Sequence, residues 1–267
     1  MPRYDFRSPR LFIDAPLSEG ATLVLEAAPA HYLADVLRLK AGDGVLVFNG
    51  RDGEWRAALA APAKKKFALA LEERTRAQTA PTNLHYLFAP LKRSRLDYMV
   101  QKAVELGAAK LAPVITRHTQ AERVNAARLR ANAIEAAEQC GILNLPEIAE
   151  PAPFARALAS LEPGRILVFC DEDSPAGSPV DALAGYIARP SPIVDNVGAD
   201  HRPPSGPTTP PIAVLVGPEG GFADDERAAL LARPNTLRLS LGPRILRADT
   251  AAVAALALVQ AVLGDWR

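Results

Sequence analysis

The chain has 267 residues, of which 49% are hydrophobic and 23% are charged, and its formal net charge is +1. This composition is typical of one large or two modest globular domains, and it excludes a disordered tail, a collagen-like chain and a small disulfide-stabilised protein. The charge is unevenly distributed, because residues 77–141 carry 9 basic and 5 acidic residues whereas residues 142–267 carry 10 and 15. We therefore expect an acidic partner to bind the first half of the chain.

The cysteines and the apolar segments predict a cytoplasmic protein without a metal site or membrane association. Cys140 and Cys170 are far apart, with neither a CxxC motif nor paired histidines nearby, which favours two reduced, buried thiols over a zinc site or a disulfide. The first residues lack the apolar core of a signal peptide, and the most apolar run, 251–263, is too short to span a bilayer.

Residues 1–76 are expected to form a small β-barrel with one helix. Strand-like runs occupy residues 21–27, 44–48 and 54–59. An Asn-Gly and an Asp-Gly pair within 49–53 are typical of a hairpin turn, since both pairs accept positive φ. Apolar residues at helical spacing predict a helix over 31–39, and the polar stretch 72–83 is interpreted as a linker.

Residues 77–267 alternate strands and helices, which predicts an α/β domain with a mainly parallel sheet. The expected strands are 84–89, 110–115, 165–170, 212–216 and 236–241, and the expected helices are 94–107, 119–140, 223–232 and 250–263. Ser94 and Thr119 are the N-caps that capping-box patterns predict for the first two helices. The proline-rich stretch 190–211 departs from this rhythm and is predicted to be a flexible surface insertion.

Two loops in this second domain each follow a predicted strand, at the edge where open α/β sheets bind their ligands. The first loop, 217–222, contains three glycines, which allow the backbone to approach a ligand closely. The second loop runs over 239–250, and its Leu241, Ile245 and Leu246 could supply apolar walls for an adenine.

A single glycine-rich loop can also be no more than a tight turn. A Walker A loop is excluded because no Gly-Lys-Ser/Thr follows, and a Rossmann fingerprint is excluded because no GxGxxG opens the first βαβ unit. The presence of two such loops about one βα unit apart, the second with Arg244 and Arg247, favours a ligand site.

Several motifs in order resemble one known family. GPEGGF at 217–222 and LGPRILRADTA at 241–251 resemble the C-terminal signature of the RsmE family, the 16S rRNA (uracil-N3)-methyltransferases of the SPOUT superfamily. The upstream segments KRSRLDYMVQKAVELG at 92–107 and EAAEQCG at 135–141 agree with this family, as does Arg-Leu-Phe at 10–12. The resemblance spans nearly the whole chain except roughly residues 190–211.

This resemblance implies a fold, a cofactor and a substrate. The C-terminal domain, 77–267, is expected to be a SPOUT-type α/β domain with a deep trefoil knot, preceded by a PUA-like RNA-binding barrel, 1–76. The protein is expected to be a homodimer that uses S-adenosylmethionine to methylate one uridine of 16S rRNA. The residues expected to bind the cofactor are Leu215, Val216, Gly217, Pro218, Glu219, Gly220, Leu239, Ser240, Leu241, Gly242, Ile245, Leu246 and Thr250.

Methylation of uracil N3 requires an accessible base, loss of the N3 proton and in-line placement of the methyl group. Arg247 and Arg95 are candidates for stabilising the negative charge that develops on the base, and Glu138 for orienting one of them or accepting the proton. In an alternative interpretation, Arg95 binds only phosphate, Arg244 and Arg247 cap carbonyl groups at the end of the sheet, and Glu138 is a solvated helix residue.

Basic residues interleaved with aromatic ones at the start of the chain suit an RNA backbone, although arginine-rich starts are often merely flexible. The residues expected to contact RNA are Arg3, Arg7, Arg10, Lys92, Arg93, Gln139 and Arg244. Two other functions fit the sequence: a SPOUT methyltransferase that acts on a ribose 2′-hydroxyl or a pseudouridine, and a non-catalytic RNA-binding assembly protein. The intact loops disfavour the second.

Overall fold

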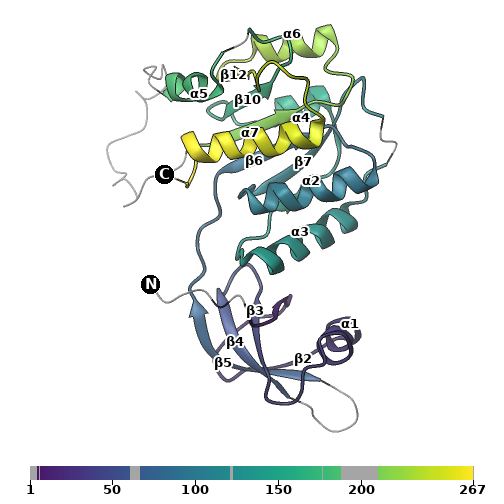
Figure 1. Cartoon of the computed structure of the whole chain (residues 1–267), viewed down its shortest axis with the longest axis vertical. Helices are drawn as coiled ribbons and strands as arrows, with labels where there is room; N and C mark the ends of the chain where they lie inside the picture. Colours follow the sequence, from purple (N-terminus) through teal and green to yellow (C-terminus); the bar gives the residue numbers. More distant parts are fainter. Residues whose placement is uncertain are drawn as a thin grey trace. The chain divides into compact units, whose positions relative to one another are not determined.

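The computed structural model describes residues 5, 7–60, 67–120, 123–175, 177–187 and 210–266 (Figure 1). The chain forms two compact units: unit 1 comprises Met1–Pro81 with Ile134–Leu145, and unit 2 comprises Thr82–Ala133 with Pro146–Arg267. Most of the proline-rich stretch, residues 190–209, lies outside the described residues. None of the helices in the described ranges is long and apolar enough to cross a membrane.

Unit 1 is built on a five-stranded sheet with the order β1-β3-β4-β5-β2. Its strands are β1 (Arg10–Phe12), β2 (Thr22–Val24), β3 (Gly44–Phe48), β4 (Glu54–Ala60) and β5 (Ala68–Arg76), and its short helical segments are α1 (Ala27–His31) and η1 (Tyr32–Val36). β1 runs parallel to β3, and the other pairs are antiparallel. Leu33, Val45, Val47, Leu59 and Leu69 are fully buried and form the core of this unit.

The predicted hairpin at 49–53 is confirmed, since β3 pairs with β4 across it. Gly53 has a φ of 84°, and any side chain there would collide with the carbonyl oxygen of Arg76. The interpretation of 72–76 as linker is wrong, because these polar residues continue β5 along β4. Their side chains are exposed or half-buried, so the hydrophobic signal for a strand is weak there.

A buried ion-pair network fixes the segment Ile134–Leu145 within unit 1. Glu54 is 1% exposed and accepts hydrogen bonds from Arg10 (2.7 Å) and Arg76 (2.6 Å). The same arginines donate to the carbonyl groups of Ala137, Gly141 and Ile142. The prediction that Arg10 contacts RNA is therefore wrong, because its guanidinium is buried by these partners and stacks on the ring of Phe48 at 3.7 Å.

Unit 2 contains a parallel sheet with the strand order β12-β10-β11-β6-β7-β8, in which β9 also pairs with β7. Its strands are β6 (Leu84–Phe88), β7 (Lys110–Ile115), β8 (Glu147–Ile148), β9 (Ala152–Pro153), β10 (Ile166–Cys170), β11 (Ile212–Val216) and β12 (Thr236–Leu239). Its helices are α2 (Arg93–Glu105), α3 (Ala126–Cys140), α4 (Phe154–Ala159), α5 (Pro179–Ile187), α6 (Asp224–Ala232) and α7 (Ala248–Val262), of which α3 ends within unit 1.

The predicted mainly parallel sheet is confirmed, since every strand pair of unit 2 is parallel. All five residues of β11 are buried, as expected of an apolar run inside a sheet that helices cover. Figure 1 shows α7 alongside α2, and contacts between these helices and between α7 and β11 bring the end of the chain onto the sheet.

The starts of two helices differ from the prediction. α2 begins at Arg93 after Lys92, so Ser94 is not its N-cap, and Asp97 instead accepts hydrogen bonds from Arg128 and Asn132. α3 begins at Ala126 rather than near Thr119. The Thr119 hydroxyl accepts the amide hydrogen of Thr116, because a side chain of this type can satisfy a turn as well as a helix end.

Neither thiol forms a disulfide, but the prediction that both are buried is wrong for Cys140, which is exposed, and Cys170 is only half-buried. In the part of the chain that the structure describes, no cluster of three or more His, Cys, Asp or Glu residues could hold a metal ion.

Candidate functional site

Three loops meet at the carboxyl edge of the unit 2 sheet. β10 lies between β11 and β12, and all three strands run in the same direction. The loops that leave them therefore emerge side by side: residues 171–174 after β10, 217–222 after β11 and 240–247 after β12. We call these the acidic loop, the glycine loop and the arginine loop.

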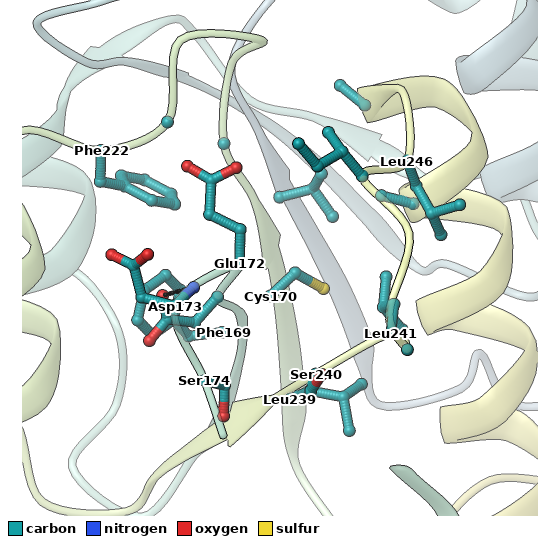
Figure 2. Close-up of a pocket in the computed structure, with 18 of the residues that line it drawn as sticks. Phe169, Cys170, Glu172, Asp173, Ser174, Phe222, Leu239, Ser240, Leu241 and Leu246 are labelled. Carbon is teal, nitrogen blue, oxygen red and sulfur yellow. Dashed lines mark hydrogen bonds between the residues drawn. The ribbon is translucent and has the colours of Figure 1, made fainter. Parts of the chain in front are cut away.

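The three loops enclose a pocket with a cavity volume of about 310 Å³ (Figure 2). Leu239, Leu241 and Leu246 lie along one side of it in Figure 2, and Glu172, Asp173 and Phe222 lie across from them. The lining residues are Phe169 to Ser174, Val216 to Glu219, Gly221, Phe222, Arg227, Leu239 to Leu246, Ala248 and Ala251. The glycine and arginine loops thus form one crevice, as expected from the sequence.

The glycine loop folds tightly over an aromatic ring. A Cβ atom at Gly217 would lie 2.7 Å from Cε2 of Phe222. That ring cannot easily move, because it packs edge-on against Phe169 at a centroid distance of 5.3 Å and lies 6.1 Å from Phe154. A side chain at Gly217 would therefore displace the loop from the pocket wall.

The loop after β7 holds the glycine loop from outside the pocket. The Nδ1 atom of His118 lies 3.0 Å from the carbonyl oxygen of Gly220 and 3.2 Å from that of Gly221, so the ring can donate to both. Glu226 accepts the amide hydrogens of Arg117 (2.9 Å) and Ala223 (3.0 Å), which ties the start of α6 to the same turn. These bonds fix the glycine loop before any ligand binds.

The acidic loop is anchored by Asp171, whose side chain is 3% exposed. Its carboxylate accepts hydrogen bonds from Arg227 of α6 (3.0 Å) and Arg238 of β12 (2.8 Å). Burial raises the pKa of Asp171, but these two guanidinium groups outweigh it and hold the pKa below its ordinary value. Asp171 therefore stays ionised and joins three elements beneath the pocket.

Cys170 also lines the pocket, where its sulfur is visible in Figure 2. Burial raises the pKa of its thiol to about 12. Since the thiolate is the nucleophilic form, this residue is not suited to covalent catalysis at neutral pH.

Most of the residues predicted to bind a cofactor line the pocket. They are Val216, Gly217, Pro218, Glu219, Leu239, Ser240, Leu241, Gly242, Ile245 and Leu246. Three others do not line it: Leu215 is buried within β11, Gly220 lies against His118, and Thr250 is exposed on the first turn of α7.

Two of the three predicted catalytic residues lie at the pocket, and the third belongs to the other unit. Arg247 is exposed at the N-cap of α7, between two lining residues, and no described residue forms a hydrogen bond or ion pair with its side chain. Arg95 lies 3.3 Å from Glu219 of the glycine loop, so it reaches the edge of the pocket. Glu138 belongs to unit 1, where it accepts the amide hydrogen of Phe12 and burial raises its pKa.

The residues predicted to contact RNA differ in whether they line the pocket. Arg244 is exposed and lines the pocket, and Lys92, Arg7 and Gln139 are exposed elsewhere on the two units. Arg3 and the side chain of Arg93 lie outside the described residues.

The acidic loop was not among the predicted ligand loops. The strand before it was predicted, and the polar run Asp171 to Ser174 follows that strand directly. Applying the carboxyl-edge rule to every predicted strand, instead of only to the glycine- and arginine-containing loops, would have identified it as a candidate.

Comparisons with known proteins agree on the class of protein. The family model described as an RNA methyltransferase domain matches residues 78–260, and the one described as an RNA methyltransferase PUA domain matches residues 25–72. The fold and the pocket are therefore those of an RNA methyltransferase with a PUA-like domain.

Individual relatives define the family more narrowly. The chain is 31% identical to ribosomal RNA small subunit methyltransferase E of Rickettsia conorii over 94% of each chain, and 33% identical to that of Synechocystis over 91% of this chain and 74% of the relative. The crystal structure of ribosomal RNA small subunit methyltransferase E from Neisseria gonorrhoeae bound to S-adenosyl methionine matches with a TM-score of 0.76 and 27% identity, covering 98% of this chain and 100% of that one. The chain belongs to the ribosomal RNA small subunit methyltransferase E (RsmE) family.

Proposed function

We propose that this protein transfers a methyl group from S-adenosylmethionine to N3 of one uridine in 16S rRNA. The observation that carries the proposal is the pocket in which the glycine and arginine loops meet, at the site that their motifs predicted. Membership of the RsmE family supports a small-subunit rRNA substrate, and the bound ligand of the Neisseria gonorrhoeae structure supports the methyl donor.

The residues of the pocket fit this donor. Its cavity of about 310 Å³ has apolar side chains at Leu239, Leu241 and Leu246, which suit an adenine, and Gly217 leaves the backbone close to the cavity without a side chain in between. When bound there, S-adenosylmethionine supplies a methyl group activated by a sulfonium. The pocket residues hold the donor, and the ordered glycine loop limits its orientations.

The base to be methylated must reach the donor unpaired, because N3 lies on the Watson–Crick edge. Loss of the N3 proton leaves negative charge on the flanking carbonyl oxygens, which an unpaired guanidinium can stabilise. Arg247 fits this role, since it lies beside the pocket and its side chain has no partner among the described residues. Arg95 is bound to Glu219, so it contributes either through that pair or after exchanging it for the substrate.

Family membership also supports a proposal about the knot of unit 2 and about the assembly of the protein. We propose that the glycine and arginine loops thread past each other as a deep trefoil knot, and that the protein works as a homodimer. Half-exposed apolar residues on α7, among them Val253 and Leu258, support the dimer because they offer a face for a second copy. The PUA-like match at 25–72 supports RNA binding by unit 1.

The function is tested by mapping methyl groups on 16S rRNA from cells that lack this protein. We expect one uridine to lose a single base methyl group, and purified protein with S-adenosylmethionine to restore it on small subunits. A methyl group lost from a ribose or a pseudouridine would assign the protein to another SPOUT activity. Unchanged rRNA together with RNA binding would favour an assembly protein.

Replacing Gly217 by alanine should weaken S-adenosylmethionine binding roughly 10- to 100-fold. The added methyl group would lie 2.7 Å from a packed Phe222 ring, so the glycine loop must shift. Titration calorimetry measures this effect. Gly185→Ala is the matched control, because a Cβ there meets nothing within 4 Å and alanine favours helix α5. Equal affinity in both variants would contradict the role of Gly217.

A further inference from the structure

Of the six charged groups that line the pocket, four have an ionic partner among the described residues, whereas Glu172 and Arg244 have none. Four carboxylates and two guanidinium groups are present: Asp171, Glu172, Asp173, Glu219, Arg227 and Arg244. Asp171 binds Arg227 and Arg238, Asp173 lies 3.7 Å from Arg227, and Glu219 lies 3.3 Å from Arg95. Among the described residues, no hydrogen bond or ion pair engages the carboxylate of Glu172.

Glu172 reaches into the pocket from the acidic loop. In Figure 2 its side chain extends across from Leu241 and Leu246. Its Oε1 atom lies 2.8 Å from the position that a Cβ of Gly221 would occupy, so the exposed carboxylate of Glu172 lies directly against the glycine loop. Gly221 also has a φ of 68°, which disfavours any other residue. The loop conformation thus keeps an unpaired negative charge at the pocket wall.

The donor and its product differ in charge. S-adenosylmethionine carries a sulfonium in addition to a zwitterionic amino acid group, so its net charge is +1, whereas S-adenosylhomocysteine is neutral overall. The ammonium of either ligand is balanced by its own carboxylate, and the sulfonium is the charge without a partner. An unpaired carboxylate in the wall therefore stabilises the donor more than the product.

We propose that Glu172 is the specificity-determining residue by which the pocket prefers the cationic methyl donor to its neutral product. This inference rests on the proposed function of the same pocket. Preference for the donor matters in each catalytic cycle, because the two molecules share an adenosine and an amino acid group and would otherwise compete equally. A residue of this kind favours product release after the methyl group has left.

Titration calorimetry of the full chain with each ligand tests the proposal. Glu172→Gln should bind S-adenosylmethionine roughly tenfold more weakly and S-adenosylhomocysteine less than about twofold more weakly. The preference for the donor should therefore fall by roughly tenfold. Glu172→Asp, which keeps the charge, should retain most of it, and raising the salt concentration should reduce it in the wild type.

Glu150→Gln is the matched control, since it makes the same substitution at an exposed glutamate of unit 2 that does not line the pocket. It should leave the preference unchanged. Equal weakening of both ligands by Glu172→Gln, or the same loss of preference in Glu150→Gln, would overturn the proposal while leaving the methyltransferase function intact. Failure of the wild type to bind either ligand would instead overturn the proposed function and this inference with it.

Discussion

Replacing Arg247 by alanine should lower the rate of methyl transfer by about 10²- to 10³-fold while S-adenosylmethionine binding changes little. The guanidinium has no described protein partner and stands at the N-cap of α7, between residues that line the pocket. Its charge is therefore available to the substrate, where it stabilises the deprotonated uracil. Single-turnover transfer to small ribosomal subunits measures the rate, and calorimetry measures donor binding.

Two further variants separate the charge from the fold. Arg247→Lys keeps the positive charge and should recover part of the activity, because an ammonium lacks the planar fork of a guanidinium. Arg156→Ala removes an exposed arginine from α4, which does not line the pocket, and should transfer methyl groups at the wild-type rate. Full turnover by Arg247→Ala would remove this residue from the mechanism.

Replacing Glu54 by glutamine should destabilise the protein by about 3 kcal/mol, because it leaves Arg10 buried without its anion. Glu54 is 1% exposed, and Arg10 and Arg76 both donate to it. Urea unfolding measures the loss. Glu73→Gln is the control: Glu73 pairs with Arg56 at the surface, where an ion pair contributes less than about 1 kcal/mol. Similar losses in the two variants would show that the buried network adds no special stability.

The stability supplied by Glu54 should depend on pH in a defined direction. Burial raises its pKa, but the hydrogen bonds from Arg76 and Arg10 outweigh this effect and lower the pKa below its ordinary value of 4.5. A carboxyl with a lowered folded pKa stabilises the native state above its unfolded pKa and loses that contribution as the pH falls through the folded pKa. The difference in unfolding free energy between wild type and Glu54→Gln should therefore shrink below about pH 4.5. A difference that stays constant down to pH 3 would contradict this assignment.

The elements that the sequence predicted well are those whose signal is local. The apolar runs of β6, β7, β10 and β11 are recovered to within one residue, because a strand covered on both faces must be apolar along its whole length. The far end of β5 was missed, since its polar residues are held by pairing with β4 and not by their own hydrophobicity. The helix starts at Arg93 and Ala126 also differ, because Ser94, Thr119 and Asp97 have alternative hydrogen-bond partners.

The sequence by itself determined the family, the two ligand loops and the glycines that let one of them fold. These features depend on residue type and spacing along the chain, and they remain readable without coordinates. Only the tertiary structure showed that β10 lies between β11 and β12 and that Glu172 lines the pocket. It also showed that Arg10, which was expected at the surface, belongs to a buried ion-pair network. Strand order and ion pairing join residues that are distant in sequence. The interactions that stabilise them therefore leave no pattern among neighbouring residues of the chain.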